Sequence, residues 1–167
     1  MTFEAQIKKF NEMYGLPYPA TPNWSAPGGA TRVANFQNIL SEELSEGDDL
    51  QQNASAAKWQ EFVNLPENKD RNLGELQSEF RLNLLTELAD WLGDIVVYCT
   101  SEAARFGIPM SEVLSIIMES NFSKLDENGK PIHDPRGKVG KGPNYWKPEP
   151  RIRELLKSRL TAGKEVA

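Results

Sequence analysis

The segment from Glu79 to Phe106 constrains the fold of this chain more than any other. Its pattern predicts one long helix that ends at Gly107, and its large apolar side chains are spread around the helix axis rather than along one stripe. Such a helix should be packed on most of its circumference. The sequence therefore predicts an all-α fold, a helical bundle in which other helices surround residues 79–106.

Three carboxylates interrupt the apolar pattern of this helix: Glu87, Asp90 and Asp94. At about 100° per residue they fall within an arc of roughly 60°, so they share one narrow face. Like charges crowded in a poorly solvated place are unfavourable unless a cation, a lysine or a proton shares the site. We interpret this face as a candidate metal site. The alternative is an acidic strip that faces water.

A second acidic group lies on the helix predicted over residues 31–46. Glu42, Glu43 and Glu46 lie at the edge of the apolar face of this helix. The EExxE spacing is a weak signal alone, because glutamate is a common helix former. Together with the acids of the central helix it becomes stronger. Two antiparallel helices can project acids into one gap and give the all-oxygen coordination that Mg²⁺ or Mn²⁺ prefers.

The rest of the chain is predicted to contain further helices and two irregular segments. Helices are expected at 2–14, at 48–63, from Pro109 or Ser111 to about residue 124, and at 150–160. The proline-rich segment 16–29 cannot be helix or central strand. Tyr18 and Trp24 in this segment could stack on a base, but aromatic residues in such loops more often fix the loop to the core.

The segment that follows residue 125 is rich in turn residues and basic side chains, and it predicts a small β-hairpin or loop near the C-terminus. Residues 121–147 carry a local net charge of +3, so the remaining chain carries −8. Asn121 and Lys124 share a helix face, a spacing suited to one phosphate; a cation that complements the helix dipole is the alternative. The other candidate phosphate-binding residues are Lys138, Lys141, Asn144 and Tyr145.

Composition limits the classes of protein to which this chain can belong. With 167 residues, 39% of them hydrophobic, the chain fits a single domain over residues 1–167. One cysteine excludes an internal disulfide, residues 1–10 lack the apolar core of a signal peptide, and no apolar run approaches the roughly 18 residues that cross a bilayer. We therefore expect a cytoplasmic protein without a membrane partner. The net charge of −5 argues against nucleic-acid binding.

Three motifs in order carry a family resemblance: EELSE at 42–46, ELADWLGD at 87–94, and SNFSKLDENGKPIHDPRGKVGKGPNY at 120–145. Residues 31–148 resemble the all-α nucleoside triphosphate pyrophosphohydrolases, a superfamily that includes MazG, the dimeric dUTPases and phosphoribosyl-ATP pyrophosphohydrolase. The last motif is most similar to MazG-like and phosphoribosyl-ATP-pyrophosphohydrolase-like proteins of bacteria and phages. The resemblance implies Mg²⁺ ligands at Glu42, Glu43, Glu46, Glu87 and Asp90, with Asp94 as a further candidate.

The resemblance also implies an activity. A (deoxy)nucleoside triphosphate would be hydrolysed to the monophosphate and pyrophosphate, in nucleotide-pool cleansing or shaping, by a homodimer or homotetramer. Glu43 and Glu46 would be catalytic, with Glu43 orienting the attacking water, while Asn121, Lys124 and the loop Lys141–Tyr145 would meet phosphate or nucleotide. Two alternatives stay open: a phosphoribosyl-ATP pyrophosphohydrolase, and a non-catalytic helical module that binds another protein.

Overall fold

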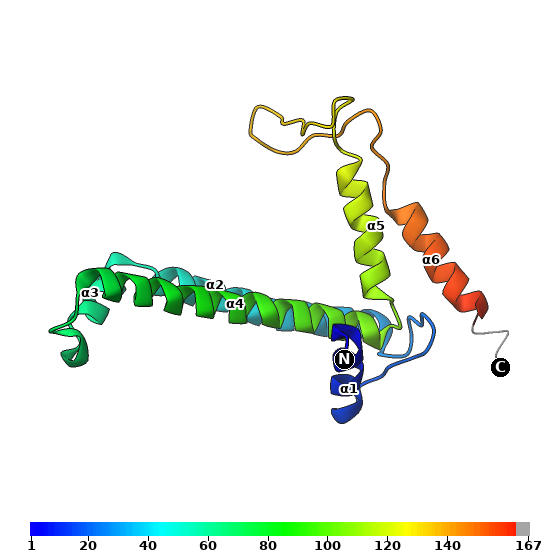
Figure 1. Ribbon diagram of the computed structural model, residues 1–167. Helices are drawn as coiled ribbons and strands as arrows, with labels where there is room; N and C mark the ends of the chain where they lie inside the picture. Colours follow the sequence, from blue (N-terminus) through cyan, green and yellow to red (C-terminus); the bar gives the residue numbers. More distant parts are fainter. Residues whose placement is uncertain (163–167) are drawn as a thin grey trace. The chain divides into compact units, whose positions relative to one another are not determined.

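The computed structural model describes residues 1–162, and within them every regular element is a helix. Figure 1 shows the elements α1 (Phe3–Met13), α2 (Gly29–Asn53), α3 (Ala56–Val63), the short 3₁₀ helix η1 (Pro66–Asn68), α4 (Leu73–Arg105), α5 (Met110–Phe122) and α6 (Glu149–Ala162). The all-α prediction is confirmed. None of these helices is both long and apolar enough to cross a membrane.

The chain divides into two compact units, which are described separately. One unit runs from Gly28 to Glu102, and the other combines Met1–Pro27 with the segment that begins at Ala103. The interpretation of the whole chain as a single domain stays a prediction.

The first unit is a long antiparallel hairpin of α2 and α4, which lie side by side, with α3 at its closed end (Figure 1). At the open end, Arg32 on α2 donates three hydrogen bonds of 2.7 to 2.9 Å to the carboxylate of Glu102 on α4. Both side chains are largely buried, and a bidentate arginine–carboxylate pair fixes the relative register of two helices well. In the middle, Trp91 Nε1 donates to the main-chain oxygen of Glu43 at 2.7 Å.

Gly47 explains why α2 is longer than predicted. The sequence suggested a helix end near residue 46, but α2 continues through Gly47 to Asn53. A Cβ at position 47 would lie 2.9 Å from Cζ2 of Trp91, so the glycine lets the indole ring lie against the backbone of α2. Gly47 is therefore a packing residue inside one helix and not a helix end. The break to α3 comes at Ala54–Ser55, where the Ser55 side chain caps the N-terminus of α3.

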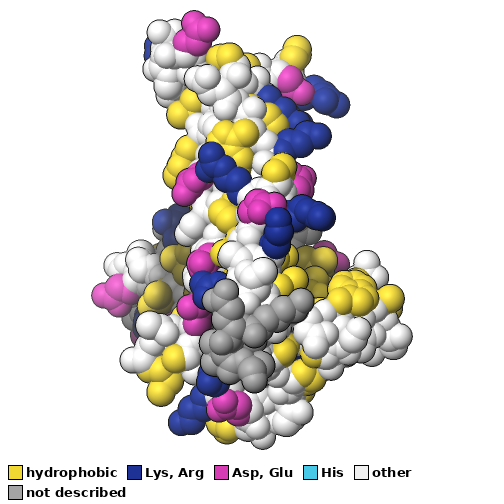
Figure 2. Space-filling view, turned by 90° about the vertical axis from the view of Figure 1, so that its right-hand side faces the viewer, with side chains coloured by type: hydrophobic (Ala, Val, Ile, Leu, Met, Phe, Trp, Pro, Cys, Tyr) yellow, Lys and Arg dark blue, Asp and Glu magenta, His cyan; other side chains and the backbone are white. Residues whose placement is uncertain are grey.

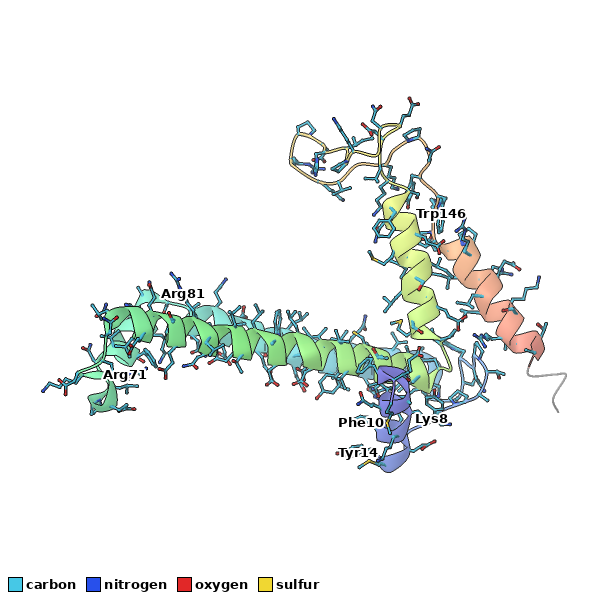
Figure 3. The ribbon with its side chains drawn as sticks, in the orientation of Figure 1. Lys8, Phe10, Tyr14, Arg71, Arg81 and Trp146 are labelled. Atoms are coloured by element: carbon cyan, nitrogen blue, oxygen red, sulfur yellow. The ribbon has the colours of Figure 1, made fainter. Side chains whose placement is uncertain are left out.

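The second unit holds α1, α5 and α6. The side chain of Thr2 caps α1 by accepting a hydrogen bond from the Ala5 amide, and Gly107, with φ +67°, ends α4 where the sequence predicted. Figure 3 shows Trp146 by the start of α6. Its ring lies 3.7 Å under the guanidinium of Arg151, and its main-chain oxygen accepts a hydrogen bond from Ser120 of α5.

Two expectations about structure are corrected. The predicted C-terminal β-hairpin is not confirmed, because residues 1–162 contain only one isolated bridge there, between His133 and Val139. The central helix is not packed on most of its circumference either: Leu82, Leu85, Leu92 and Val96 are each 48 to 61% exposed.

Candidate functional site

The carboxyl group of Glu43 is the most unusual polar group of the α2–α4 hairpin. Glu43 is 9% exposed, and its Oε2 atom has no hydrogen-bond partner among the described residues. Native proteins pair the great majority of buried polar atoms, so an unpaired carboxylate oxygen of this kind calls for a ligand or a proton.

Several acids act on this group. Burial raises the pKa of the Glu43 carboxyl above its ordinary value of 4.5, and the charges of Glu46, Asp94 and Glu42 raise it further. A hydrogen bond from the Tyr98 hydroxyl opposes the shift, and the charge of Glu43 in turn raises the pKa of Tyr98 above 10.0. The hairpin thus brings four of the six candidate metal ligands into electrostatic range of one another.

The other two candidate ligands, Glu87 and Asp90, lie on the exposed surface of α4. Glu87 already has a partner, because its Oε2 accepts a hydrogen bond of 3.1 Å from Asn53 of α2. Asp90 is placed between Glu87 and Asp94 along the helix, as the sequence spacing predicted.

The six acids do not form a finished metal cage. Within residues 1–162, no group of three or more His, Cys, Asp or Glu side chains is arranged to hold a metal ion. The donor chemistry nevertheless fits Mg²⁺, because the candidate ligands are all carboxylates and Glu43 offers an unpaired oxygen. Glu42, Glu46 and Asp94, whose charges act on Glu43, are exposed.

Two of the candidate phosphate-binding lysines, Lys124 and Lys141, lie in the second unit after the C-terminal end of α5. Lys124 Nζ donates to Asn121 Oδ1 at 2.7 Å, which agrees with their predicted shared face. The Lys141 ammonium lies 4.7 Å from the centre of the Tyr145 ring, a cation–π contact. In Figure 2 the upper end of the view is this region, where Lys and Arg side chains lie next to hydrophobic ones.

Gly142 holds the basic loop against α5. Its amide donates to the main-chain oxygen of Lys124 at 2.9 Å, and a Cβ at this position would lie 1.9 Å from the oxygen of Leu125. Only glycine fits such a close approach of two backbones. Lys141 and Asn144, which flank this contact, are therefore kept near Lys124, while both side chains stay exposed.

Lys138 is part of a different turn. Its amide donates to Asp134 Oδ1 at 2.9 Å, and backbone hydrogen bonds from Lys138 and Arg136 lower the pKa of Asp134 below 3.8. The Lys138 side chain is exposed, and its place in the candidate site stays a prediction.

Trp24 of the proline-rich segment contacts the end of α4, although its side chain is 61% exposed. The Trp24 ring lies 5.5 Å from that of Phe106, and the Asn23 amide donates to the main-chain oxygen of Phe106 at 2.8 Å. Gly107 fits close beneath Thr21. These contacts fix the segment to the end of α4.

Sequence reasoning missed Tyr98, Trp91 and Asn53, which contact the acids or their backbone. The spacing of Asp94 and Tyr98, four residues apart on one helix, was the available signal for Tyr98. Nothing in the sequence marked Asn53, since its contact depends on how far α2 extends beyond Gly47.

The chain was compared with protein families, curated proteins and solved structures. No family model and no curated protein matches the chain. Among solved structures, it is similar to the crystal structure of a "putative NTP pyrophosphohydrolase" from Exiguobacterium sp. 255-15. The two share 20% sequence identity over 98% of each chain, with a TM-score of 0.45.

Proposed function

We propose that this protein hydrolyses a (deoxy)nucleoside triphosphate to the monophosphate and pyrophosphate with the help of Mg²⁺, and so cleanses or shapes the nucleotide pool. The observation that carries the proposal is the buried, unpaired Oε2 of Glu43 beside the charges of Glu46, Asp94 and Glu42. A divalent cation relieves both the missing hydrogen bond and the repulsion. An all-oxygen donor set suits Mg²⁺ best, and Mn²⁺ is the next candidate.

In this proposal the ligands come from both helices of the hairpin. Glu42, Glu43 and Glu46 belong to α2, and Glu87, Asp90 and Asp94 belong to α4. A bound Mg²⁺ supplies an activated water and neutralises charge on the triphosphate. As a ligand, Glu87 would either share its carboxylate between the ion and Asn53 or lose its hydrogen bond with the Asn53 amide.

In the same proposal, residues of this chain orient the attacking water and bind the phosphates. Glu43 orients the attacking water, with Tyr98 holding its carboxylate in place, and Glu46 assists as the second catalytic carboxylate. Asn121, Lys124 and Lys141 are suited to charge-assisted hydrogen bonds with phosphate oxygens. Lys138, Asn144 and Tyr145 complete the proposed nucleotide-binding loop.

We also propose a homo-oligomer, a dimer or a tetramer. The exposed apolar residues of α4 form a stripe, defined here as Leu82, Leu85, Ala89, Leu92 and Val96. Their spacing alternates between three and four residues, as in helices that pack along a seam. A stripe of this length in water is unusual for a monomer, and a second copy of the hairpin would cover it.

The proposed activity is tested by its products. Purified protein with Mg²⁺ and a nucleoside triphosphate should release pyrophosphate, and Glu43→Gln should lower kcat by about 10² to 10⁴, the range for a lost acid–base group. The control is Glu67→Gln, which alters an exposed acid outside the hairpin gap. Orthophosphate and a diphosphate as main products would contradict the proposal. A protein without turnover and without any Mg²⁺ effect on melting would support the non-catalytic alternative.

A further inference from the structure

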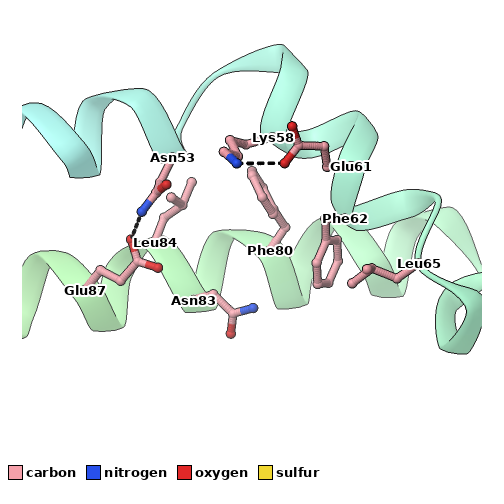
Figure 4. Close-up of a pocket in the computed structure, with 9 residues that line it drawn as sticks. All are labelled: Asn53, Lys58, Glu61, Phe62, Leu65, Phe80, Asn83, Leu84 and Glu87. Carbon is pink, nitrogen blue, oxygen red and sulfur yellow. Dashed lines mark hydrogen bonds and ion pairs between the residues drawn. The ribbon is translucent and has the colours of Figure 1, made fainter.

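A pocket of about 300 Å³ opens at the closed end of the hairpin, where α3 packs on α4 (Figure 4). It lies wholly within the unit Gly28–Glu102. Its volume is at the lower end of the range for small-molecule sites. Of the candidate metal ligands, only Glu87 lines this pocket, and no residue of the basic loop does.

One wall of the pocket is aromatic. Phe62 of α3 and Phe80 of α4 line it, with ring centres 5.4 Å apart, and Trp59 supports both from behind at 6.2 and 5.3 Å. Three rings that pack on one another lose little freedom when a ligand arrives. They give a rigid apolar surface of the kind on which a planar heteroaromatic ring stacks.

The polar groups around this wall are mostly amides. Asn83 lines the pocket, and its side-chain amide forms no hydrogen bond with any residue from 1 to 162. The NH₂ group of Asn53 donates a hydrogen bond to Glu87, and its side-chain carbonyl oxygen stays available to a ligand. A carboxamide offers a donor and an acceptor side by side, which is the pattern needed to pair with the edge of a base.

The charges at the rim do not suit a phosphate. Lys58 and Glu61 pair with each other at 2.7 Å and cancel, which leaves the carboxylate of Glu87 as the remaining charge. A phosphate would meet net negative charge here, whereas an uncharged ring would meet aromatic surface and amides.

We propose that this pocket binds the nucleobase of the nucleotide, with Phe62 and Phe80 stacking on the ring and Asn83 pairing with its edge. The inference rests on the proposed function and names its specificity site. Asn83 precedes Glu87 by about one helical turn, so the pocket adjoins the acidic face Glu87–Asp94 along α4. A nucleotide with its base in the pocket thereby directs its phosphates toward the proposed metal ligands.

Two measurements test this proposal. In steady-state kinetics on the four deoxynucleoside triphosphates, Asn83→Ala should lower kcat/KM for the preferred base by about tenfold, mainly through KM, and reduce the preference over the others. Asn38→Ala, an exposed asparagine on α2 that lines no part of this pocket, is the matched control and should keep wild-type kinetics. Phe80→Leu should weaken binding of every base.

The second measurement needs no turnover. Titration of the metal-free protein with the four nucleosides, which lack phosphate, should quench the fluorescence of Trp59, and the quench should be absent in Trp59→Phe. Equal quench in Asn83→Ala and wild type, together with an unchanged base preference, would overturn the pocket assignment. If wild type hydrolyses no triphosphate but still binds a nucleoside through Asn83, the proposed function fails and the pocket assignment stands.

Discussion

At the scale of single residues, Glu43 couples stability to pH. Its pKa is raised in the folded protein, first by burial and then by Glu46, Asp94 and Glu42. The folded state therefore binds this proton more tightly than the unfolded state. Its contribution to stability is greatest at low pH and falls as pH rises from about 4.5 through the raised pKa.

Glu43→Gln should remove that pH-dependent loss and keep the acceptor for Tyr98. In the metal-free protein at pH 7, we expect the variant to melt no lower than wild type, with the difference between them vanishing near pH 4. Saturating Mg²⁺ should then stabilise wild type, by about 2.7 kcal/mol at 100 times the dissociation constant, and the variant much less. Thermal melts across pH, with and without Mg²⁺, check this. A variant that melts lower at every pH would mean that the carboxylate has a structural partner.

The lysines at the end of α5 are the second test at this scale. Lys124→Ala and Lys141→Ala should each lower kcat/KM. The decrease should correspond to a loss of about 1 to 3 kcal/mol of transition-state stabilisation, the size of a charge-assisted hydrogen bond to phosphate. Lys130→Ala removes an exposed lysine from the same loop and serves as the control. Wild-type kinetics in both test variants would exclude the phosphate role of this loop.

At the scale of the helix, Gly47 shows what local patterns miss. A glycine inside a helix is normally destabilising by about 1 kcal/mol relative to alanine. Here Gly47→Ala should destabilise the protein by about 1 to 3 kcal/mol, because the new Cβ would overlap Trp91, whose indole is held by its hydrogen bond to Glu43. Gly93→Ala on α4 should instead stabilise the protein, because open space surrounds the new Cβ and alanine is the better helix former. Urea unfolding of the two variants measures both, and a stabilising Gly47→Ala would show that Trp91 can move freely.

The same example shows how much could be predicted from sequence. Periodicity predicted the helices, because spacing of apolar residues depends only on the local backbone. It also placed Glu42, Glu43 and Glu46 at the edge of an apolar face, and the three acids of the central helix on one narrow face. It could not predict that Glu43 becomes buried, that Tyr98 reaches its carboxylate, or that α2 continues to Asn53. Those facts depend on the register of the two helices, which Arg32–Glu102 and the fit of Trp91 on Gly47 determine.

The pocket at α3 was hidden for a related reason. In the sequence, Trp59, Phe62 and Phe80 look like ordinary apolar residues of helices, and Asn53 and Asn83 carry no recognisable motif. Only the end of α2 at Asn53 and the turn into α3 bring these side chains to one place.

At the scale of the whole molecule, we expect the exposed stripe of α4 to be the surface on which copies of the chain assemble. Its members lie on one side of α4, and none of them carries a charge. Burying four large apolar side chains of this kind stabilises an interface by about 1.5 to 3 kcal/mol per fully buried side chain, before the unfavourable entropy of association is subtracted. The wild-type protein should therefore sediment as a dimer or tetramer at micromolar concentration.

Leu85→Glu should shift that equilibrium to the monomer, because pairing two copies would bury a carboxylate on each of them. The matched control is Leu73→Glu. Leu73 is 64% exposed, close to the 60% of Leu85, but it lies at the first turn of α4, outside the stripe. Sedimentation equilibrium of wild type and both variants decides the matter, with circular dichroism to show that each stays helical. If Leu85→Glu keeps the wild-type mass, or if wild type is monomeric at all concentrations, the stripe is not the interface between copies.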